Sequence, residues 1–135
     1  MKRTGSNSLM AFWADFDAAD IPAFREWHNC EHMTERCSIP GFNVGRRYNG
    51  IGDAPTVLMY YETDEAAVLA SEAYHARLND PTPWTQATLP TFKNADRNIF
   101  TLLADAGAPA ETESPYTTTL RFNLAAEEED DALDW

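Results

Sequence analysis

Residues 27–36 read Trp27-His28-Asn29-Cys30-Glu31-His32-Met33-Thr34-Glu35-Arg36. Successive residues of an α-helix are rotated by about 100°, so a helix here would bring two histidines and two carboxylates onto one face: His28, Glu31, His32 and Glu35. Four groups that can transfer protons or bind a cation would then share that face. The stretch therefore predicts a site, and the segments on either side of it predict the fold.

The pattern of apolar residues predicts a set of strands and helices around this stretch. A mostly apolar strand is expected over 9–16, and a helix over 21–36, where Asp20 and Pro22 are typical of a helix start. Two strands, over 42–49 and 56–62, should pair antiparallel through the turn at 50–55. A second helix over 64–78, a short helical piece over 84–89 and a last strand over 98–104 complete the order.

This order is strand, helix, strand, strand, helix, strand, which is that of a ferredoxin-like βαββαβ fold of the α+β class. Its helices cover one face of a four-stranded antiparallel sheet, so the other face, rich in aromatic residues, needs a partner sheet. A homodimer through this open face is the simplest way to supply one. In the strand over 42–49, strict alternation predicts a shared face for Phe42, Val44, Arg46 and Tyr48.

Charge divides the chain into two parts. Of the formal net charge of −12, residues 105–135 carry −8, from nine acidic residues and one arginine, which leaves −4 for residues 1–104. We therefore expect a domain over 1–104 and an acidic extension over 105–135. Neither part has the basic stripe that a phosphate backbone requires, so we expect no nucleic-acid partner.

The sequence predicts a cytoplasmic protein that does not contact a membrane. No apolar segment is long enough for a signal sequence or a membrane span. Cys30 and Cys37 would lie about 10 Å apart along the predicted helix, too far for a disulfide, which fits a reducing compartment.

The acidic extension resembles the start of the chain. Residues 12–27 can be laid over residues 120–135 without gaps, and both segments end in tryptophan, Trp27 and Trp135. We expect an extra strand over 117–124 and loosely held last residues. The segment is either the start of a truncated second repeat or an acidic tail.

Three features together resemble the dimeric α+β barrel superfamily, and most closely its EthD-like branch: residues 24–32, the Ile39-Pro40-Gly41-Phe42 turn, and the element order over 9–104. In the EthD-type pattern an aromatic pair is followed, after three residues, by a histidine. Trp27 stands for the first aromatic residue and His32 for the histidine, whereas His28 takes the place of the second aromatic residue.

This resemblance implies two sheets paired into a barrel, with pockets between sheet and helices. Relatives include cofactor-free polyketide cyclases, muconolactone isomerases, quinol-type monooxygenases and haem-handling enzymes. The resemblance therefore implies the fold more firmly than any one of these reactions.

His32 is the first candidate for catalysis, because an imidazole that titrates near neutrality can take and return a proton. Glu35 or Glu31, one turn away, would orient it, and His28 is a further candidate. The alternative is a surface face: the buried stripe would then consist of Ala23, Trp27, Cys30, Thr34 and Cys37, with both histidines in solvent.

Candidate substrate-binding residues come from the strands and the second half of the chain. Arg46 and Tyr48 could hold an enolate, phenolate or carboxylate, although Arg46 and Arg47 could equally pair with surface acids. Aromatic residues that could line a pocket, or simply form core or interface, are Trp27, Tyr60, Tyr61, Trp84 and Phe92.

The leading hypothesis is a small cofactor-independent enzyme, a lyase, isomerase or cyclase, that acts on a hydrophobic oxygenated aromatic or polyketide-like compound. One alternative is a non-catalytic ligand-binding or assembly module, and another is a haem- or metal-dependent monooxygenase. His28 and His32 also fit the spacing of inverted zinc proteases, but no third ligand is apparent, so we predict no metal or cofactor.

Overall fold

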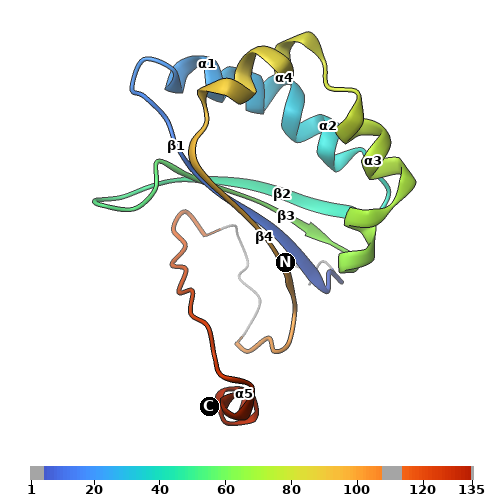
Figure 1. Cartoon of the computed structure of the whole chain (residues 1–135), viewed down its shortest axis with the longest axis vertical. Coiled ribbons are helices and arrows are strands. Elements are labelled where there is room, and N and C mark those ends of the chain that lie inside the picture. Colours follow the sequence, from blue (N-terminus) through green and yellow to red (C-terminus); the bar gives the residue numbers. More distant parts are fainter. Residues whose placement is uncertain (1–4, 108–113, 135) are drawn as a thin grey trace.

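One antiparallel sheet organises the part of the chain that the structure, a computed structural model, describes: residues 5–107 and 114–134. Its four strands lie in the order β2-β3-β1-β4 (Figure 1). Their bounds are β1 (Ser8–Asp15), β2 (Phe42–Asn49), β3 (Val57–Thr63) and β4 (Lys93–Thr101). β1 pairs antiparallel with both β3 and β4, and β2 pairs antiparallel with β3. The predicted ferredoxin-like α+β fold is therefore confirmed.

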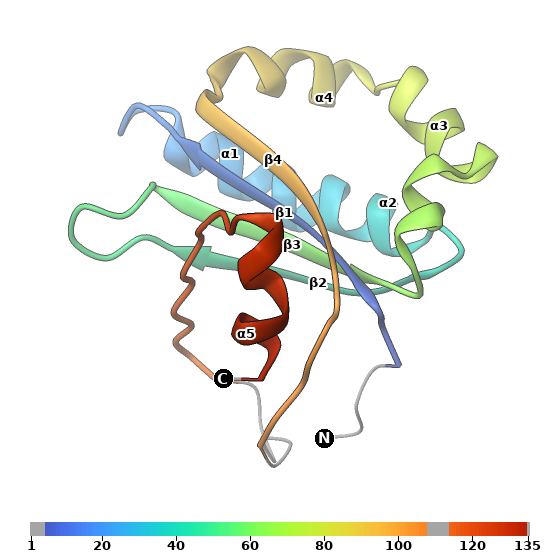
Figure 2. The ribbon, with the colours of Figure 1, turned by 60° about the horizontal axis from the view of Figure 1, so that its bottom comes forward.

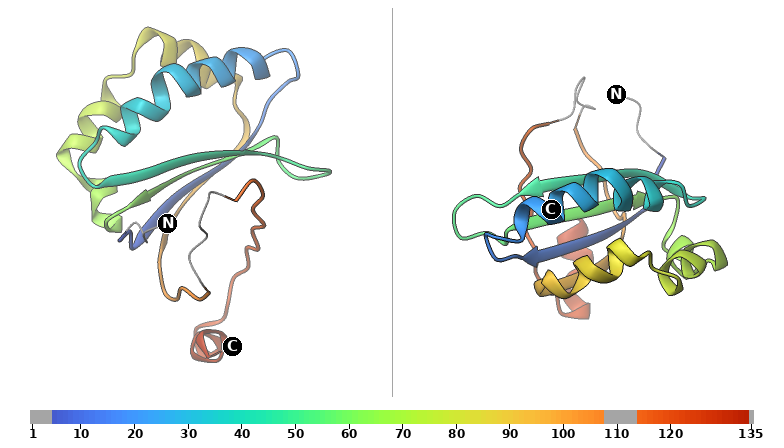
Figure 3. Two further views of the ribbon diagram at one scale, coloured as in Figure 1. Left: turned by 180° about the vertical axis from the view of Figure 1, so that it is seen from behind. Right: turned by 90° about the horizontal axis from the view of Figure 1, so that it is seen from above.

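The helices that connect these strands lie on one face of the sheet. The first helix is continuous but composite: α1 (Ile21–Trp27) passes through a π-helical turn (His28–His32) into α2 (Met33–Cys37). A 3-10 turn (Ala66–Ala70), α3 (Glu72–Asn79), α4 (Pro83–Thr88) and a second 3-10 turn (Leu89–Thr91) follow β3. Seen from above, the first helix runs beside α3 and α4 (Figure 3). Within the described ranges, none of the helices is long and apolar enough to cross a membrane.

Two elements begin at other residues than predicted. α3 is capped by Ser71, whose hydroxyl accepts a hydrogen bond from the Tyr74 N–H, and not by Asp64, which precedes the separate 3-10 turn. β4 begins at Lys93 rather than at Asn98, because its polar first half pairs with β1 as an edge strand that carries no apolar pattern.

β2 contains a β-bulge at Asn43. Phe42 and Val44 lie two residues apart but pair with adjacent residues of β3, Thr63 and Glu62. One extra residue shifts the alternation of side chains by one position, so Phe42 and Val44 face opposite sides of the sheet.

This bulge reverses the predicted faces of two candidate residues. Arg46 and Tyr48, expected on the side of Phe42, lie on the opposite, open face, where they pair across the strands with Tyr60 and Leu58. The prediction of their face was wrong because the composition of β2 gives no signal of an extra residue. Arg47 points towards the helices instead.

Apolar side chains pack on both faces of the sheet. Beneath the helices, two clusters of buried residues form the core: Met10, Ile39, Phe42, Tyr61, Leu69 and Tyr74 in one, and Ala14, Phe16, Phe24, Trp27, Val57 and Met59 in the other. A smaller cluster lies on the open face and consists of Ala11, Trp13 and Leu58, flanked by Leu9, Tyr48 and Tyr60. Burial of this apolar surface is the main force that holds helices and sheet together.

Gly45 of β2 allows α2 to lie close against the sheet. A Cβ atom at this position would lie 2.2 Å from Met33 Sδ and 2.9 Å from Cys37 Sγ. The absence of a side chain therefore sets how near the first helix approaches the strand that carries Arg47.

The C-terminal segment lies across the open face of the sheet, opposite to α1–α4 (Figures 1 and 2). The Arg121 guanidinium lies 3.8 Å from the centroid of the Trp13 ring and forms an ion pair with Asp96 of β4. Nearer the start of the segment, the Tyr48 hydroxyl donates a hydrogen bond to the Ser114 carbonyl at 3.2 Å. The segment thus covers part of the face on which a partner sheet was expected.

The predicted strand over 117–124 is not formed in the structure, which gives these residues no regular secondary structure. They cross the face of the sheet, whereas a further strand would need to run along β2 or β4, where backbone groups are free to pair. A 3-10 turn (Ala126–Glu128) and α5 (Glu129–Leu133) follow. Of the predicted domain and extension, residues 1–4, 108–113 and Trp135 lie outside the described residues.

Candidate functional site

The first helix turns its histidines towards the sheet. His28 is fully buried, with 0% of its surface exposed, and Trp27 is buried beside it at 1%. The alternative stripe is wrong, because Cys30 and Thr34 are exposed. The burial of His28 and Trp27 therefore favours a functional site on this side of the helix over a surface in solvent.

A local change of helix type helps to place these side chains. The Met33 N–H donates to the His28 carbonyl, which is the i to i+5 hydrogen bond of a π-helix, and the π-helical turn spans His28–His32. Such turns are rare and occur often at functional sites. Both candidate histidines lie at the ends of this turn, on the side of the core.

His28 bridges the helix and the sheet through both of its ring nitrogens. Its Nδ1 lies 3.0 Å from the Arg47 guanidinium, and its Nε2 lies 3.1 Å from the hydroxyl of Tyr61 on β3. Burial, and then the positive charge of Arg47, lower the pKa of His28 from 6.5 to about 4. His28 is therefore neutral near pH 7.

His32 lies next to His28, one turn along the helix. Its ring stacks on Trp27 with 4.3 Å between ring centroids and meets the ring of Tyr61 edge-on at 6.3 Å. Burial, and then the charge of Arg36, lower its pKa from 6.5 to about 3. Its Nδ1 atom is buried and has no hydrogen-bond partner among the residues that the structure describes.

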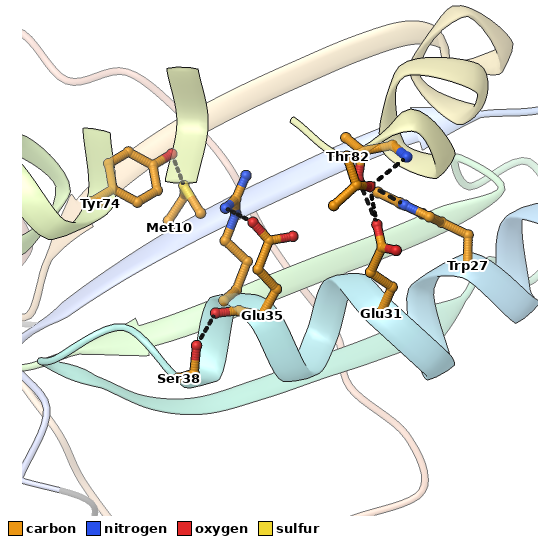
Figure 4. A network of polar contacts seen from close by, with 9 residues as sticks. Met10, Trp27, Glu31, Glu35, Ser38, Tyr74 and Thr82 are labelled. Carbon is orange, nitrogen blue, oxygen red and sulfur yellow. Dashed lines mark hydrogen bonds and ion pairs between the residues drawn. The ribbon is translucent and has the colours of Figure 1, made fainter. Parts of the chain in front are cut away.

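The side chain of Glu31 points towards Thr82, at the start of α4 (Figure 4). Its carboxylate accepts hydrogen bonds from the hydroxyls of Thr82 and Thr85, and the Thr85 oxygen also accepts one from the Trp27 indole N–H at 3.1 Å. Glu31 thus orients the helix that lies beside Trp27.

Glu35 pairs with its neighbour in the sequence, Arg36, at 3.5 Å, as Figure 4 also shows. Within the described ranges, no hydrogen bond joins Glu31 or Glu35 to His32. The carboxylates therefore contact other partners than the histidine that the sequence paired with them.

The remaining predicted binding residues lie elsewhere. Tyr48 and Tyr60 stack on each other on the open face, with 6.1 Å between ring centroids, and Arg46 shares that face. Trp84 lies on α4 and is 39% exposed. The structure therefore divides the predicted residues: His28, His32 and Trp27 lie together on the helix side, and Arg46, Tyr48 and Tyr60 lie on the open face.

Two residues of the cluster were underestimated from the sequence. Tyr61 was considered more as core than as pocket lining, yet the alternation of Val57, Met59 and Tyr61 already predicts a shared face on β3. Arg47 was assigned no site, because only the bulge in β2 turns it towards His28.

A groove of about 960 Å³ lies on the other side of the sheet, between the open face and the C-terminal segment. Tyr60, Trp13 and Phe100 line it from the sheet, and residues 117–123 line it from the segment. It holds none of the histidines, so the groove and the histidine cluster are separate features.

The histidine pair does not extend to a metal site in the described part of the chain, since no three His, Cys, Asp or Glu side chains gather there. His28 uses both ring nitrogens on protein partners. Of the two histidines that have the spacing of inverted zinc proteases, His28 takes part in a hydrogen-bond network with Arg47 and Tyr61.

Comparison with solved structures identifies the fold. A dimeric ferredoxin-like protein from an uncultured marine organism aligns with a TM-score of 0.61 at 12% identity, over 81% of this chain and 99% of that chain. A monooxygenase from Streptomyces coelicolor, in complex with the ligand nanaomycin D, aligns with a TM-score of 0.58 at 12% identity, over 80% and 96%. An EthD family protein from Bacillus halodurans aligns with a TM-score of 0.53 at 13% identity, over 73% and 99%.

The chain therefore shares the ferredoxin-like α+β fold of these proteins, which is the fold that the resemblance predicted. At these levels of identity the similarity shows the fold alone. No protein-family model matches the chain, and no curated protein matches its sequence.

Proposed function

We propose that this protein is a small enzyme in which His32 removes a proton from a hydrophobic, oxygenated aromatic or polyketide-like compound. The buried Nδ1 atom of His32, which has no partner among the described residues, carries this proposal. Buried polar atoms are almost always paired, so an unpaired ring nitrogen beside aromatic rings supports a place for a ligand here.

The charges around His32 support proton removal. Its lowered pKa keeps the imidazole neutral, and therefore able to accept a proton, at neutral pH. Arg36 is buried at 7% exposure, and Arg47 contacts the neighbouring His28. The positive charge of Arg47 favours a negatively charged ligand, and such an anion would in turn raise the pKa of His32 as it takes the proton.

The chemistry needs only an acidic proton and a stabilised anion. Removing a proton next to a carbonyl or from a phenol gives an enolate or phenolate, and lyase, isomerase and cyclase reactions can each begin with this step. Trp27 provides an aromatic surface, Glu35 balances the charge of Arg36, and Glu31 holds α4 in place. The S. coelicolor monooxygenase, which has the same fold, is found in complex with the ligand nanaomycin D, and this supports a small-molecule ligand here.

We also propose a homodimer through the open face of the sheet, as in the dimeric ferredoxin-like protein of the same fold. Ala11, Trp13 and Leu58 supply the apolar centre of this face. In the single chain Arg121 covers Trp13, so the C-terminal segment must move from this position when two copies pair.

The test is hydrogen-deuterium exchange of 2-tetralone, a hydrophobic aromatic ketone with an activated methylene group, followed by proton NMR in D₂O. We expect the protein to accelerate exchange and the His32→Asn variant to lose this acceleration. His75→Asn is the matched control, since His75 is exposed on α3.

Equal acceleration by His32→Asn and the wild type would remove His32 as the base. If the wild-type protein binds 2-tetralone without accelerating its exchange, the site is a ligand-binding module and the enzyme proposal is wrong. A haem-type absorption band in the purified protein would instead support the monooxygenase alternative.

A further inference from the structure

The hydrogen bonds around His28 have fixed donors and acceptors, because one of its two partners, Arg47, can only donate. An arginine side chain carries N–H groups and no acceptor, so Arg47 can only donate in its 3.0 Å contact with His28 Nδ1. Nδ1 must then present its lone pair. A neutral imidazole carries one proton, which therefore lies on Nε2.

The protonation of His28 also fixes the role of Tyr61 in their hydrogen bond. The His28 Nε2–H points at the Tyr61 hydroxyl oxygen, 3.1 Å away, so that oxygen accepts and its own proton must point elsewhere. Burial raises the pKa of Tyr61 above its usual value, so the hydroxyl keeps this proton at neutral pH. Tyr61 thus has a proton to donate that His28 cannot accept.

A complementary acceptor lies in the same cluster. The Nδ1 atom of His32 is buried without a partner among the described residues, and its ring meets the ring of Tyr61 edge-on. The cluster therefore contains one unused donor and, when the proton of neutral His32 lies on Nε2, one unused acceptor. A ligand that carries an oxygen next to an acidic proton, such as a phenol or an enolisable ketone, can satisfy both.

We infer that Arg47 and His28 are positioning residues that make Tyr61 the hydrogen-bond donor to the ligand oxygen while His32 takes the ligand proton. This inference rests on the proposed function of His32 and names the substrate class more closely. The bond that breaks is the O–H or C–H bond of the ligand. Its proton moves to Nδ1 of His32, and the electron pair stays on the ligand as a phenolate or enolate that Tyr61 stabilises.

The direction of the network can be measured without a ligand. The nitrogen-15 shifts of the imidazole rings of the free, full-length protein report which ring nitrogen carries the proton. We expect His28 to be a neutral Nε2–H tautomer. In Arg47→Met, which lacks the donor, we expect this preference to be lost, and in Arg47→Lys, which still only donates, to be kept. An Nδ1–H tautomer or a charged His28 in the wild type would overturn the inference.

The role of Tyr61 is tested with 4-nitrophenol, which absorbs visible light as the phenolate. We expect the wild type to bind the phenolate, and Tyr61→Phe to bind it about tenfold or more weakly, the typical effect of losing one hydrogen bond to a charged group. Tyr74→Phe is the matched control, because Tyr74 is also buried on the helix side but bonds to Arg97. Equal loss in both variants, or no loss in Tyr61→Phe, would contradict the assignment.

Variants at His28 separate positioning from simple packing. Glutamine can accept from Arg47 and donate to Tyr61, so His28→Gln should retain most phenolate binding, whereas His28→Phe should lose it while remaining folded. Equal binding by the two variants would refute the positioning role. If the wild type does not bind the probe, the proposed ligand class and the donor role of Tyr61 both fail, while the tautomer measurement still decides the direction of the network.

Discussion

The carboxylate of Glu31 accepts a hydrogen bond from the Thr85 hydroxyl at 3.0 Å, across the contact between the first helix and α4. Thr85 is buried, and its oxygen also receives the indole N–H of Trp27. Glu31, which the sequence indicated as one of two residues that could orient His32, is thus hydrogen-bonded to the helix that flanks the site.

This contact predicts a loss of stability when Glu31 is removed. Glu31→Ala leaves the Thr85 hydroxyl in a buried place without its charged acceptor, so we expect the free energy of unfolding to fall by about 1–3 kcal/mol. Urea unfolding measures this loss. Glu26→Ala, at an exposed position of the same helix, is the control, and equal stability of the two variants would show that the contact contributes little.

Gly45 predicts a sharp steric limit between α2 and β2. In Gly45→Ala, the new Cβ would collide with Met33 Sδ, and we expect a destabilisation of about 1–3 kcal/mol in thermal or urea unfolding. Met33→Ala makes room for it. The loss in the double variant should therefore be clearly smaller than the sum of the two single losses, and simple additivity would contradict the packing argument.

Acid should destabilise the protein through its two buried histidines. The pKa of His28 is lowered to about 4 and that of His32 to about 3, so between about pH 6.5 and 4 the unfolded chain binds more protons than the folded protein. The free energy of unfolding therefore falls as the pH decreases through this window. Asp15 and Asp96, whose pKa values lie below 3.8, contribute only at lower pH.

The measurement is the melting temperature as a function of pH. A His28→Gln and His32→Asn double variant should show a much flatter slope between pH 6.5 and 4.5, and His75→Asn should keep the wild-type slope. A double variant with an unchanged slope would assign the acid sensitivity to other groups.

The C-terminal segment predicts how the open face behaves. Removing residues 107–135 uncovers Trp13 and its apolar neighbours, so we expect the shortened chain to self-associate at lower concentration than the full chain. Sedimentation velocity measures the change. Removal of residues 126–135 alone, which leaves Arg121 on Trp13, should have little effect. If the chain that lacks residues 107–135 associates less than the full chain, the segment instead holds the dimer together.

The order of strands and helices could be predicted from the sequence because it depends on local patterns. Apolar alternation, the Asp20 and Pro22 helix start and the turn at 50–55 each act over a few residues, and the folded chain satisfies them together. The resemblance of residues 24–32 to a known pattern predicted the same fold and pointed to His32, which stacks on Trp27 in the structure.

The orientation of the side chains in the site, and their hydrogen-bond partners, could not be predicted in the same way. Nothing in the composition of β2 distinguishes Arg46 from Arg47, and only the extra residue at Asn43 turns Arg47 to the helices. Likewise, the choice of Glu31 between His32 and the hydroxyls of α4 depends on where α4 packs, which is a contact between residues about fifty positions apart.

The bulge at Asn43 makes the length of β2 a determinant of its chemistry. If the same residues alternated regularly from Phe42 without the bulge, Arg46 would face the histidines and Arg47 the opposite side of the sheet. Inserting or deleting one residue between Asn43 and Arg46 would therefore exchange the side chain that faces the histidines, without any substitution.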